Sequence, residues 1–345
     1  MVKLAAIKQA NAALKTSLPS PTAVVAGGTA GIGLAFLTEL AAQTASPTIY
    51  IIGRSSANLA TIIASLTTLN PAGTYIPIVT PDLTLVSNFR DAAKQILAHG
   101  PKKVDILFLS PGYLSFTPRQ ESPEGLDKLS TLRYYGRMRL VLDLLPLLDA
   151  APAPRVLNVL AGGKEGKVHA DDLGLRDPAH NGFIIAAVST PTYTTVFFEK
   201  LARLHPKISF VHSYPGAVKT GLLNRTEVGW PVLSFLLYWV VIPLIGWLVL
   251  IPAKESGERH LWAATAGVFA SREVAAAAAA AGKAEVEVGS DGVRGSGTYT
   301  VNEKGETVVN DEVLKEIRET GVDEKIWEHT FEEYKRILGE NSEDL

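Results

Sequence analysis

The sequence has no cysteine among its 345 residues, which excludes a disulfide framework, a thiol nucleophile and a metal site with cysteine ligands. An excess of charge of one sign is also missing. The 33 basic and 35 acidic side chains leave a net charge of −2, so we expect no nucleic-acid partner. His169 beside Asp171-Asp172 is typical of a surface loop, and we expect no metal site. A secretion signal is missing too, because residues 1–20 have the pattern of a leading amphipathic helix; we expect a cytoplasmic protein.

Apolar side chains, by contrast, are plentiful, and a hydrophobic content of 47% suits one large α/β domain. Several short apolar runs end in glycine or polar residues, as parallel strands do at a ligand crevice. These runs are Thr22 to Ala26, Ile49 to Ile52, Tyr75 to Val79 and Val104 to Leu109. They predict a doubly wound parallel sheet, a Rossmann fold with helices on both faces, over residues 21–270. Residues 271–345 are expected to pack on it as an appendage, with a hairpin at 298–309 and a helix at 312–338.

The first apolar run leads into a glycine-rich loop, Gly27 to Gly33, which opens a helix-like stretch. In such a loop Gly27 allows a tight turn, Gly31 lets backbone N–H groups approach a pyrophosphate, and Gly33 permits close packing of helix on sheet. The alternative is an ordinary glycine turn between strand and helix.

The second apolar run leads to Arg54. An acidic residue at this strand end would bind the ribose 2′-hydroxyl of NAD(H), whereas an arginine accepts the 2′-phosphate of NADP(H). The sequence therefore favours NADP(H) as cofactor. The alternative is a solvated strand-end arginine with no ligand.

Taken in order, these segments resemble the short-chain dehydrogenase/reductase superfamily. Gly27 to Gly33 is similar to its TGxxxGIG loop, Asp82-Leu83 to its adenine-contacting pair, Leu109 to Gly112 to its NNAG segment, and Pro215 to Thr220 to its PGxVxT nicotinamide segment. Further stretches are similar to a divergent filamentous-fungal subgroup found among secondary-metabolite enzymes. The resemblance implies cofactor contacts from Gly27, Thr29, Ala30, Gly31, Ile32, Gly33, Arg54, Asp82, Leu83, Ser110, Pro111, Gly112, Pro215, Gly216, Val218 and Thr220.

The catalytic residues of that superfamily are replaced. The position of its serine reads Leu160-Ala161-Gly162, its Tyr-x-x-x-Lys pair falls near Ile185 and Ser189, and its helix asparagine falls near Arg133. Lys200 lies about two helical turns beyond Tyr193, too far along the helix to restore the pair.

Four other residues are the candidates for catalysis: Tyr134, Tyr135, Arg137 and Tyr193. A tyrosine beside an arginine is expected to have a lowered pKa and to donate a proton to a carbonyl oxygen, while the arginine stabilises the oxyanion. The alternative is that these side chains anchor an interface, because the matching helix forms the dimer bundle in many relatives. That alternative predicts a homodimer.

Residues 228–251 contain no charged side chain and three tryptophans. They are long enough to span a bilayer, for which about 20 apolar residues suffice. Pro231, Pro243 and Gly246 would break a spanning helix, and the segment follows the nicotinamide motif, so we expect a substrate lid over 221–262 that makes an apolar pocket for a hydrophobic small molecule. The alternatives are a lid that also contacts a membrane surface and a true span.

These observations predict an NADP(H)-dependent reductase of a hydrophobic, carbonyl-bearing metabolite of polyketide or terpenoid type. A reductase can survive the loss of its usual acid, because general acid catalysis supplies roughly 3–5 kcal/mol and holding the reactants in contact roughly 7–11 kcal/mol. The alternatives are a non-redox isomerase, cyclase or dehydratase of a secondary metabolite on the same scaffold, and a catalytically inactive nucleotide-binding protein.

Overall fold

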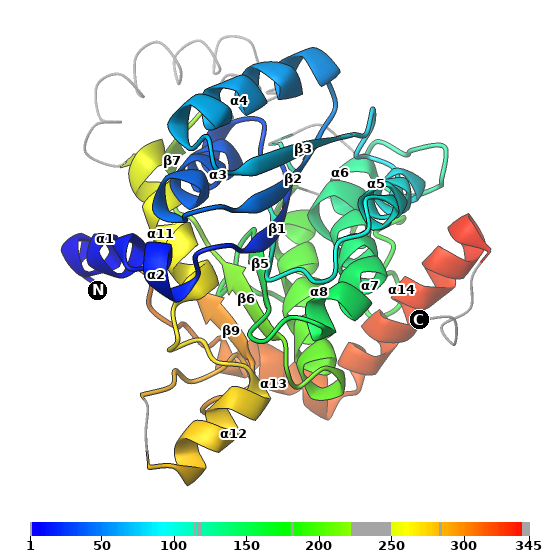
Figure 1. Ribbon diagram of the computed structural model, residues 1–345. Coiled ribbons are helices and arrows are strands. Elements are labelled where there is room, and N and C mark those ends of the chain that lie inside the picture. Colours follow the sequence, from blue (N-terminus) through cyan, green and yellow to red (C-terminus); the bar gives the residue numbers. More distant parts are fainter. Residues whose placement is uncertain are drawn as a thin grey trace.

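A parallel sheet of seven strands forms the centre of the computed structural model, which describes residues 2–113, 115, 119–180, 183–221, 250–282 and 285–339. In chain order the strands are β1 (Thr22–Ala26), β2 (Thr48–Gly53), β3 (Thr74–Val79), β4 (Ile106–Leu109), β5 (Arg155–Val159), β6 (Ser209–Ser213) and β9 (Thr298–Val301). In space they follow the order β3-β2-β1-β4-β5-β6-β9 (Figure 1). The order reverses between β1 and β4, where doubly wound sheets bind their ligands.

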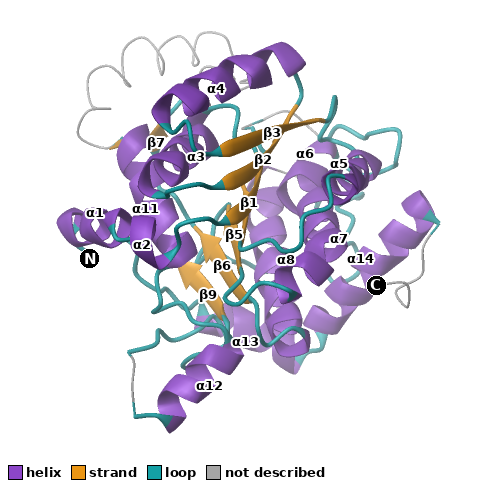
Figure 2. Ribbon diagram, viewed as in Figure 1, coloured by secondary structure: helices purple, strands orange, loops and turns teal. Residues whose placement is uncertain are grey.

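Helices cover both faces of this sheet (Figure 2). Alternate residues of β1 point to opposite faces, so that Val24 joins one core and Val25 the other. Because both faces are covered, β1, β2 and β4 are buried and apolar along most of their length, and the predicted doubly wound α/β fold is confirmed. One face is covered by α5 (Val86–Ala98), α7 (Gly136–Asp149) and α8 (Phe183–Leu204), and the other by α3 (Gly31–Gln43), α4 (Ser56–Leu69) and α11 (Ala253–Thr265).

The N-terminal residues form α1 (Leu4–Ala12) and α2 (Leu14–Ser17). Buried Asn11 donates a hydrogen bond of 2.8 Å from its side-chain nitrogen to the carbonyl oxygen of Glu258 in α11. This contact fixes the leading helix to the main domain.

The helix that carries Tyr134 is built from three successive pieces. It begins at Asp127, whose carboxylate accepts the Ser130 N–H at 2.9 Å and caps the short α6 (Lys128–Ser130). A π-helical turn, η1 (Thr131–Tyr135), follows and runs directly into α7. Such turns widen a helix locally and are frequent at functional sites.

The C-terminal region adds to the core more than the sequence indicated. After α12 (Arg272–Ala280), strand β9 pairs in parallel with β6 and becomes the last strand of the central sheet. The turn after β9 closes with an antiparallel bridge from Val301 to Thr307, as expected of a hairpin. The charged stretch expected as one helix is divided at Gly321, where φ is 70°, into α13 (Asp311–Glu319) and α14 (Val322–Leu338).

Helix α14 lies against α7 and α8. The Trp327 ring stacks on Phe197 with ring centroids 4.6 Å apart, and the Tyr334 hydroxyl donates to the Tyr135 carbonyl oxygen at 2.6 Å. α14 therefore covers the helix surface at Tyr134 and Tyr135, for which a dimer interface was the alternative prediction.

Candidate active site

The glycine loop is packed so tightly that side chains are excluded from it. Gly27 has φ of 86°, and a Cβ there would lie 2.7 Å from the Pro111 nitrogen beyond β4. A Cβ on Gly33 would overlap the carbonyl oxygen of Gly27. Gly31, with φ of 57°, would meet the Thr220 side chain at 3.3 Å. The loop thus brings together the segments that follow β1, β4 and β7 (Val218–Lys219).

The N-terminus of α3 is open for an anion. Ala30 is its N-cap, no side chain caps the helix, and no acidic residue lies in its first turn. Its first backbone N–H groups therefore lack a side-chain acceptor, and the helix dipole favours a negative charge there. The loop from Gly27 to Gly33 has glycine at positions where a Cβ would be too close to neighbouring atoms. Together with the free helix end, this geometry fits a dinucleotide pyrophosphate.

The other expected cofactor residues lie at the same edge of the sheet. Arg54 is exposed just beyond β2, while Ser55 caps α4 through the Asn58 N–H at 3.3 Å. Asp82 stabilises the turn after β3 by accepting the Thr84 N–H at 2.8 Å, and Leu83 beside it is buried. The ligand contacts of all these residues stay predictions, and the segments that carry them follow neighbouring strands of the sheet.

Arg137 connects the ends of β4 and β5 at this edge of the sheet. The buried guanidinium donates to the carbonyl oxygens of Leu132 at 2.8 Å, Pro111 at 2.5 Å and Val159 at 2.8 Å, and to Asn158 Oδ1 at 2.6 Å. Burial lowers the pKa of Arg137 to about 9, which leaves the group charged at neutral pH. Most of its N–H groups are engaged within the protein, and its role as an oxyanion stabiliser stays a prediction.

A buried polar network that the sequence analysis missed holds the loop after β5. The Ala161 N–H donates to His212 Nε2 at 3.2 Å, so the proton of that imidazole sits on Nδ1. Nδ1 then donates to Thr195 Oγ1 at 2.8 Å, and Thr195 donates to Glu165 Oε1 at 2.7 Å. Burial lowers the pKa of His212 to about 3 and raises that of Glu165. The network fixes the strand end at which the sequence predicts that the superfamily's serine is replaced.

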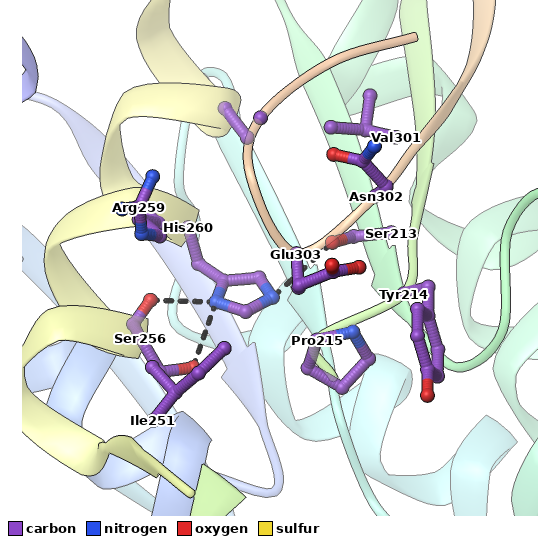
Figure 3. A pocket seen from close by; sticks show the side chains of 12 residues that line it. Ser213, Tyr214, Pro215, Ile251, Ser256, Arg259, His260, Val301, Asn302 and Glu303 are labelled. Atoms are coloured by element: carbon purple, nitrogen blue, oxygen red, sulfur yellow. Dashed lines mark hydrogen bonds between the residues drawn. The ribbon is translucent and has the colours of Figure 1, made fainter. Parts of the chain in front are cut away.

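A small pocket lies between the end of β6, helix α11 and the turn after β9 (Figure 3). Buried His260 donates from Nδ1 to the Ser256 carbonyl oxygen at 2.6 Å, and Ser213 Oγ donates to its Nε2 at 3.2 Å. Burial, and not these partners, keeps the imidazole neutral. The pocket is lined by Ser213, Tyr214, Pro215, Ile251, Ser256, Arg259, His260, Ala263, Val301, Asn302, Glu303 and Gly305.

His260 makes stability depend on pH. Burial lowers its pKa from 6.5 to about 4, so between these values an unfolded chain binds a proton that the folded chain does not. The neutral imidazole therefore contributes stability that is complete above pH 6.5 and is lost as the pH falls towards 4. We expect His260→Asn to flatten the pH dependence of the unfolding free energy in this range by about 1.4 kcal/mol per pH unit, the effect of one proton.

Urea unfolding at several pH values measures that slope, which is independent of any constant destabilisation by the substitution. The exposed His99, replaced by Asn, is the control and should leave the slope unchanged. A slope in His260→Asn equal to that of the wild type would show that His260 is not the group responsible.

Comparison with known proteins identifies the family. A model of the short chain dehydrogenase family matches residues 21–169. Oxidoreductase AN1596 of Emericella nidulans is 38% identical over 96% of this chain and 97% of its own length. The chain belongs to the short-chain dehydrogenase/reductase family. Short-chain dehydrogenase/reductase SAT2 of Stachybotrys chartarum is 28% identical over 94% of each chain. The solved Pseudomonas aeruginosa RhlG/NADP complex shares the fold, with a TM-score of 0.54 and 20% identity over 74% of this chain and 93% of the other.

The three tyrosines predicted to take part in catalysis are all hydrogen-bonded inside the protein. The hydroxyl of Tyr134 bonds to Thr330 at 2.7 Å, that of Tyr135 to His329 at 2.9 Å, and that of Tyr193 donates to the Leu173 carbonyl oxygen at 3.1 Å. The lowered pKa expected for them is wrong. Burial raises the pKa of all three phenols, because no solvent stabilises a phenolate there. Their catalytic role stays a prediction, but two of the three hydroxyls face α14.

Two further positions complete the comparison with the family. Lys200, on the same helix as Tyr193, forms an ion pair with Glu324 and lies over the Trp327 ring at 4.9 Å, so it is bound to α14. Arg133, at the family's asparagine position, is buried in the π-helical turn near Asp127 and Tyr113. Burial lowers the pKa of its guanidinium.

The predicted lid lies mostly outside the described residues, including the segment 228–251 except for its last two positions. Its two ends are held side by side, because Val218 pairs with Ile251 in a short parallel sheet of β7 and β8 (Ile251–Pro252). In the part of the chain that the structure describes, no helix is both long and apolar enough to cross a membrane.

Proposed function

We propose that this short-chain dehydrogenase/reductase is an NADP(H)-dependent reductase of hydrophobic carbonyl compounds of secondary metabolism. The observation that carries the proposal is the glycine loop, Gly27 to Gly33, at the open N-terminus of α3, with exposed Arg54 at the end of the next strand. The uncharged segment 228–251, which follows the Pro215 to Thr220 motif, supports an apolar substrate. The fungal relatives named as oxidoreductases support the reaction class.

In this proposal each segment has a distinct task. The first N–H groups of α3 hold the pyrophosphate, and Arg54 pairs with the 2′-phosphate. The Pro215 to Thr220 segment orients the nicotinamide, and the carbonyl of the substrate lies beside it at the ends of β5 and β6. The reduced cofactor, when bound, supplies a hydride to the carbonyl carbon. The oxygen then needs a proton, which the family's tyrosine cannot supply in this chain.

Arg54→Glu tests the choice of cofactor. We expect it to weaken NADPH binding by about 10–100-fold, because a charge-assisted hydrogen bond to phosphate is lost and a repulsive charge is introduced. NADH binding should change little, since NADH has no 2′-phosphate. Fluorescence titration of both nucleotides measures the two affinities.

The matched control is Arg203→Glu, the same change of charge at the exposed C-terminal end of α8. Equal affinity of the wild type for NADPH and NADH would contradict the assignment of Arg54. Failure to bind either nucleotide would contradict the reductase itself. If deuterium from labelled NADPH never reaches a product that still forms, the isomerase or cyclase alternative takes its place.

A further inference from the structure

Any reductase on this scaffold needs a proton donor for the carbonyl oxygen. The donor must lie at the carboxyl edge of the sheet beside the nicotinamide segment, must be partly open to the crevice, and must have a hydroxyl that the protein does not already use. Tyr134, Tyr135 and Tyr193 are buried and hydrogen-bonded to partners. They therefore meet neither the condition of partial openness nor the condition of an unused hydroxyl.

Tyr214 meets the first and the last of these conditions, and its side chain is half-buried. It follows β6 directly and precedes Pro215, so it begins the segment that the family uses for the nicotinamide. Its backbone is fixed, because its N–H donates to the Val301 carbonyl oxygen at 2.7 Å. Its side chain is half-buried, lies at the pocket of Figure 3, and makes no hydrogen bond through its hydroxyl with the described residues.

Lys164 lies beside it, on the loop after the neighbouring strand β5. Its ammonium is 5.4 Å from the centroid of the Tyr214 ring, within the range of a cation–π contact. No carboxylate pairs with that ammonium in the part of the chain that the structure describes, and the side chain is exposed. A tyrosine and a lysine therefore lie close together, as they do in the family's Tyr-x-x-x-Lys pair. Here the two residues follow the ends of two strands instead of lying on one helix.

The loop that carries Lys164 is held in place on both sides of it. The Gly163 N–H donates to Glu165 Oε1 at 3.0 Å, and the Gly166 N–H donates to Thr192 Oγ1 of α8 at 2.9 Å. The Lys164 N–H itself closes a turn onto the Ala161 carbonyl oxygen at 3.0 Å. The buried Glu165, Thr195 and His212 network described above anchors this loop to α8 and β6. The backbone that carries Lys164 is therefore fixed, with the ammonium 5.4 Å from the centroid of the Tyr214 ring.

We propose that Tyr214 is the catalytic proton donor of the proposed reductase and that Lys164 is the positioning residue that stabilises its phenolate. As the carbonyl carbon accepts the hydride from NADPH, the C=O π bond breaks and the oxygen takes the proton of the Tyr214 hydroxyl. A C–H and an O–H bond form, giving the alcohol. The negative charge passes to Tyr214 beside the Lys164 ammonium, and the phenolate recovers a proton from water.

The first test needs neither substrate nor turnover. Tetranitromethane nitrates tyrosines through their phenolate, and peptide mass spectrometry locates the product. We expect Tyr214 to be nitrated in the wild type and to be protected when NADP⁺ is bound. Lys164→Met should slow nitration of Tyr214 severalfold, and Lys164→Arg should restore it, because the cation is what favours the phenolate.

Lys167→Met, on the same loop but paired with Glu316 at 3.9 Å, is the matched control and should leave nitration of Tyr214 unchanged. Equal nitration in Lys164→Met and the wild type would overturn the role of Lys164. If NADPH binds but NADP⁺ gives Tyr214 no protection, Tyr214 is not at the reacting site and the inference fails while the cofactor assignment stands.

The second test is the rate of NADPH oxidation with 9,10-phenanthrenequinone as a hydrophobic diketone probe. Tyr214→Phe should lower kcat by about 10²-fold, the effect of losing a general acid, with little change in KM or in NADPH affinity. Tyr75→Phe, whose hydroxyl bonds to the Asn70 carbonyl oxygen at 3.1 Å far from β6, is the control. A full rate in Tyr214→Phe, or such a loss in Tyr134→Phe, Tyr135→Phe or Tyr193→Phe instead, would overturn the proposal. If the wild type does not reduce this diketone, the nitration results alone decide.

Discussion

Gly33→Ala is expected to lower the affinity for NADPH by at least about 10²-fold. It is also expected to destabilise the fold by roughly 1–3 kcal/mol, the usual range for overpacking. The added methyl group would overlap the backbone carbonyl of Gly27, which cannot rotate away as a side chain would. Gly27 has no room to retreat, because it is packed against Ser110 and Pro111. The N-terminus of α3 must therefore move, and its N–H groups would no longer point towards the pyrophosphate.

NADPH fluorescence titration and urea unfolding measure the two effects. Gly267→Ala is the matched control, because a Cβ at Gly267 meets no atom within 4 Å and both quantities should stay at their wild-type values. Wild-type affinity in Gly33→Ala would mean that the glycine loop is an ordinary turn. The segment from Gly27 to Gly33 would then connect strand and helix without binding a pyrophosphate.

Arg137→Met is expected to destabilise the protein by roughly 3–5 kcal/mol, because it removes a buried cation that satisfies several acceptors at once. The carbonyl oxygens of Leu132, Pro111 and Val159 would be left without this donor. Since two of these carbonyls follow β4 and end β5, the edge of the sheet that is proposed to bind the cofactor would loosen as well.

Denaturant unfolding followed by circular dichroism measures the loss. Arg203→Met removes an exposed arginine from α8 and should stay within about 0.5 kcal/mol of the wild type. Arg137→Lys should also be destabilised, because a single ammonium cannot reach all of these acceptors. A small effect of Arg137→Met would show that water replaces the guanidinium at this strand edge.

The sequence predicted the sheet well, for a local reason. Each strand of a doubly wound sheet is a continuous apolar run followed by its own turn, so β1 to β4 and the residues after them could be recognised one at a time. β9 was expected only as part of a hairpin at 298–309, and its pairing with β6 could not be recognised because it joins segments far apart in the chain.

Side-chain environments were harder to foresee than strands. Tyr134 lies next to arginines in the sequence, and this proximity suggested a lowered pKa. Its hydroxyl instead meets Thr330 of α14, and burial decides the direction of the shift. Tyr214 was overlooked for a related reason, since Lys164 comes close to it only because β5 and β6 are neighbours. Its place just before Pro215 in the nicotinamide motif was the available signal.

The position of β9 affects how this protein is made. During synthesis β6 leaves the ribosome well before Thr298–Val301, at roughly 5–20 residues per second, and the apolar segment 228–251 emerges in between. Until β9 arrives, one side of β6 has unpaired N–H and C=O groups that can capture a strand from another chain. The nascent chain therefore needs protection during this interval, and a product terminated before residue 298 would have an unpaired edge in place of its last strand.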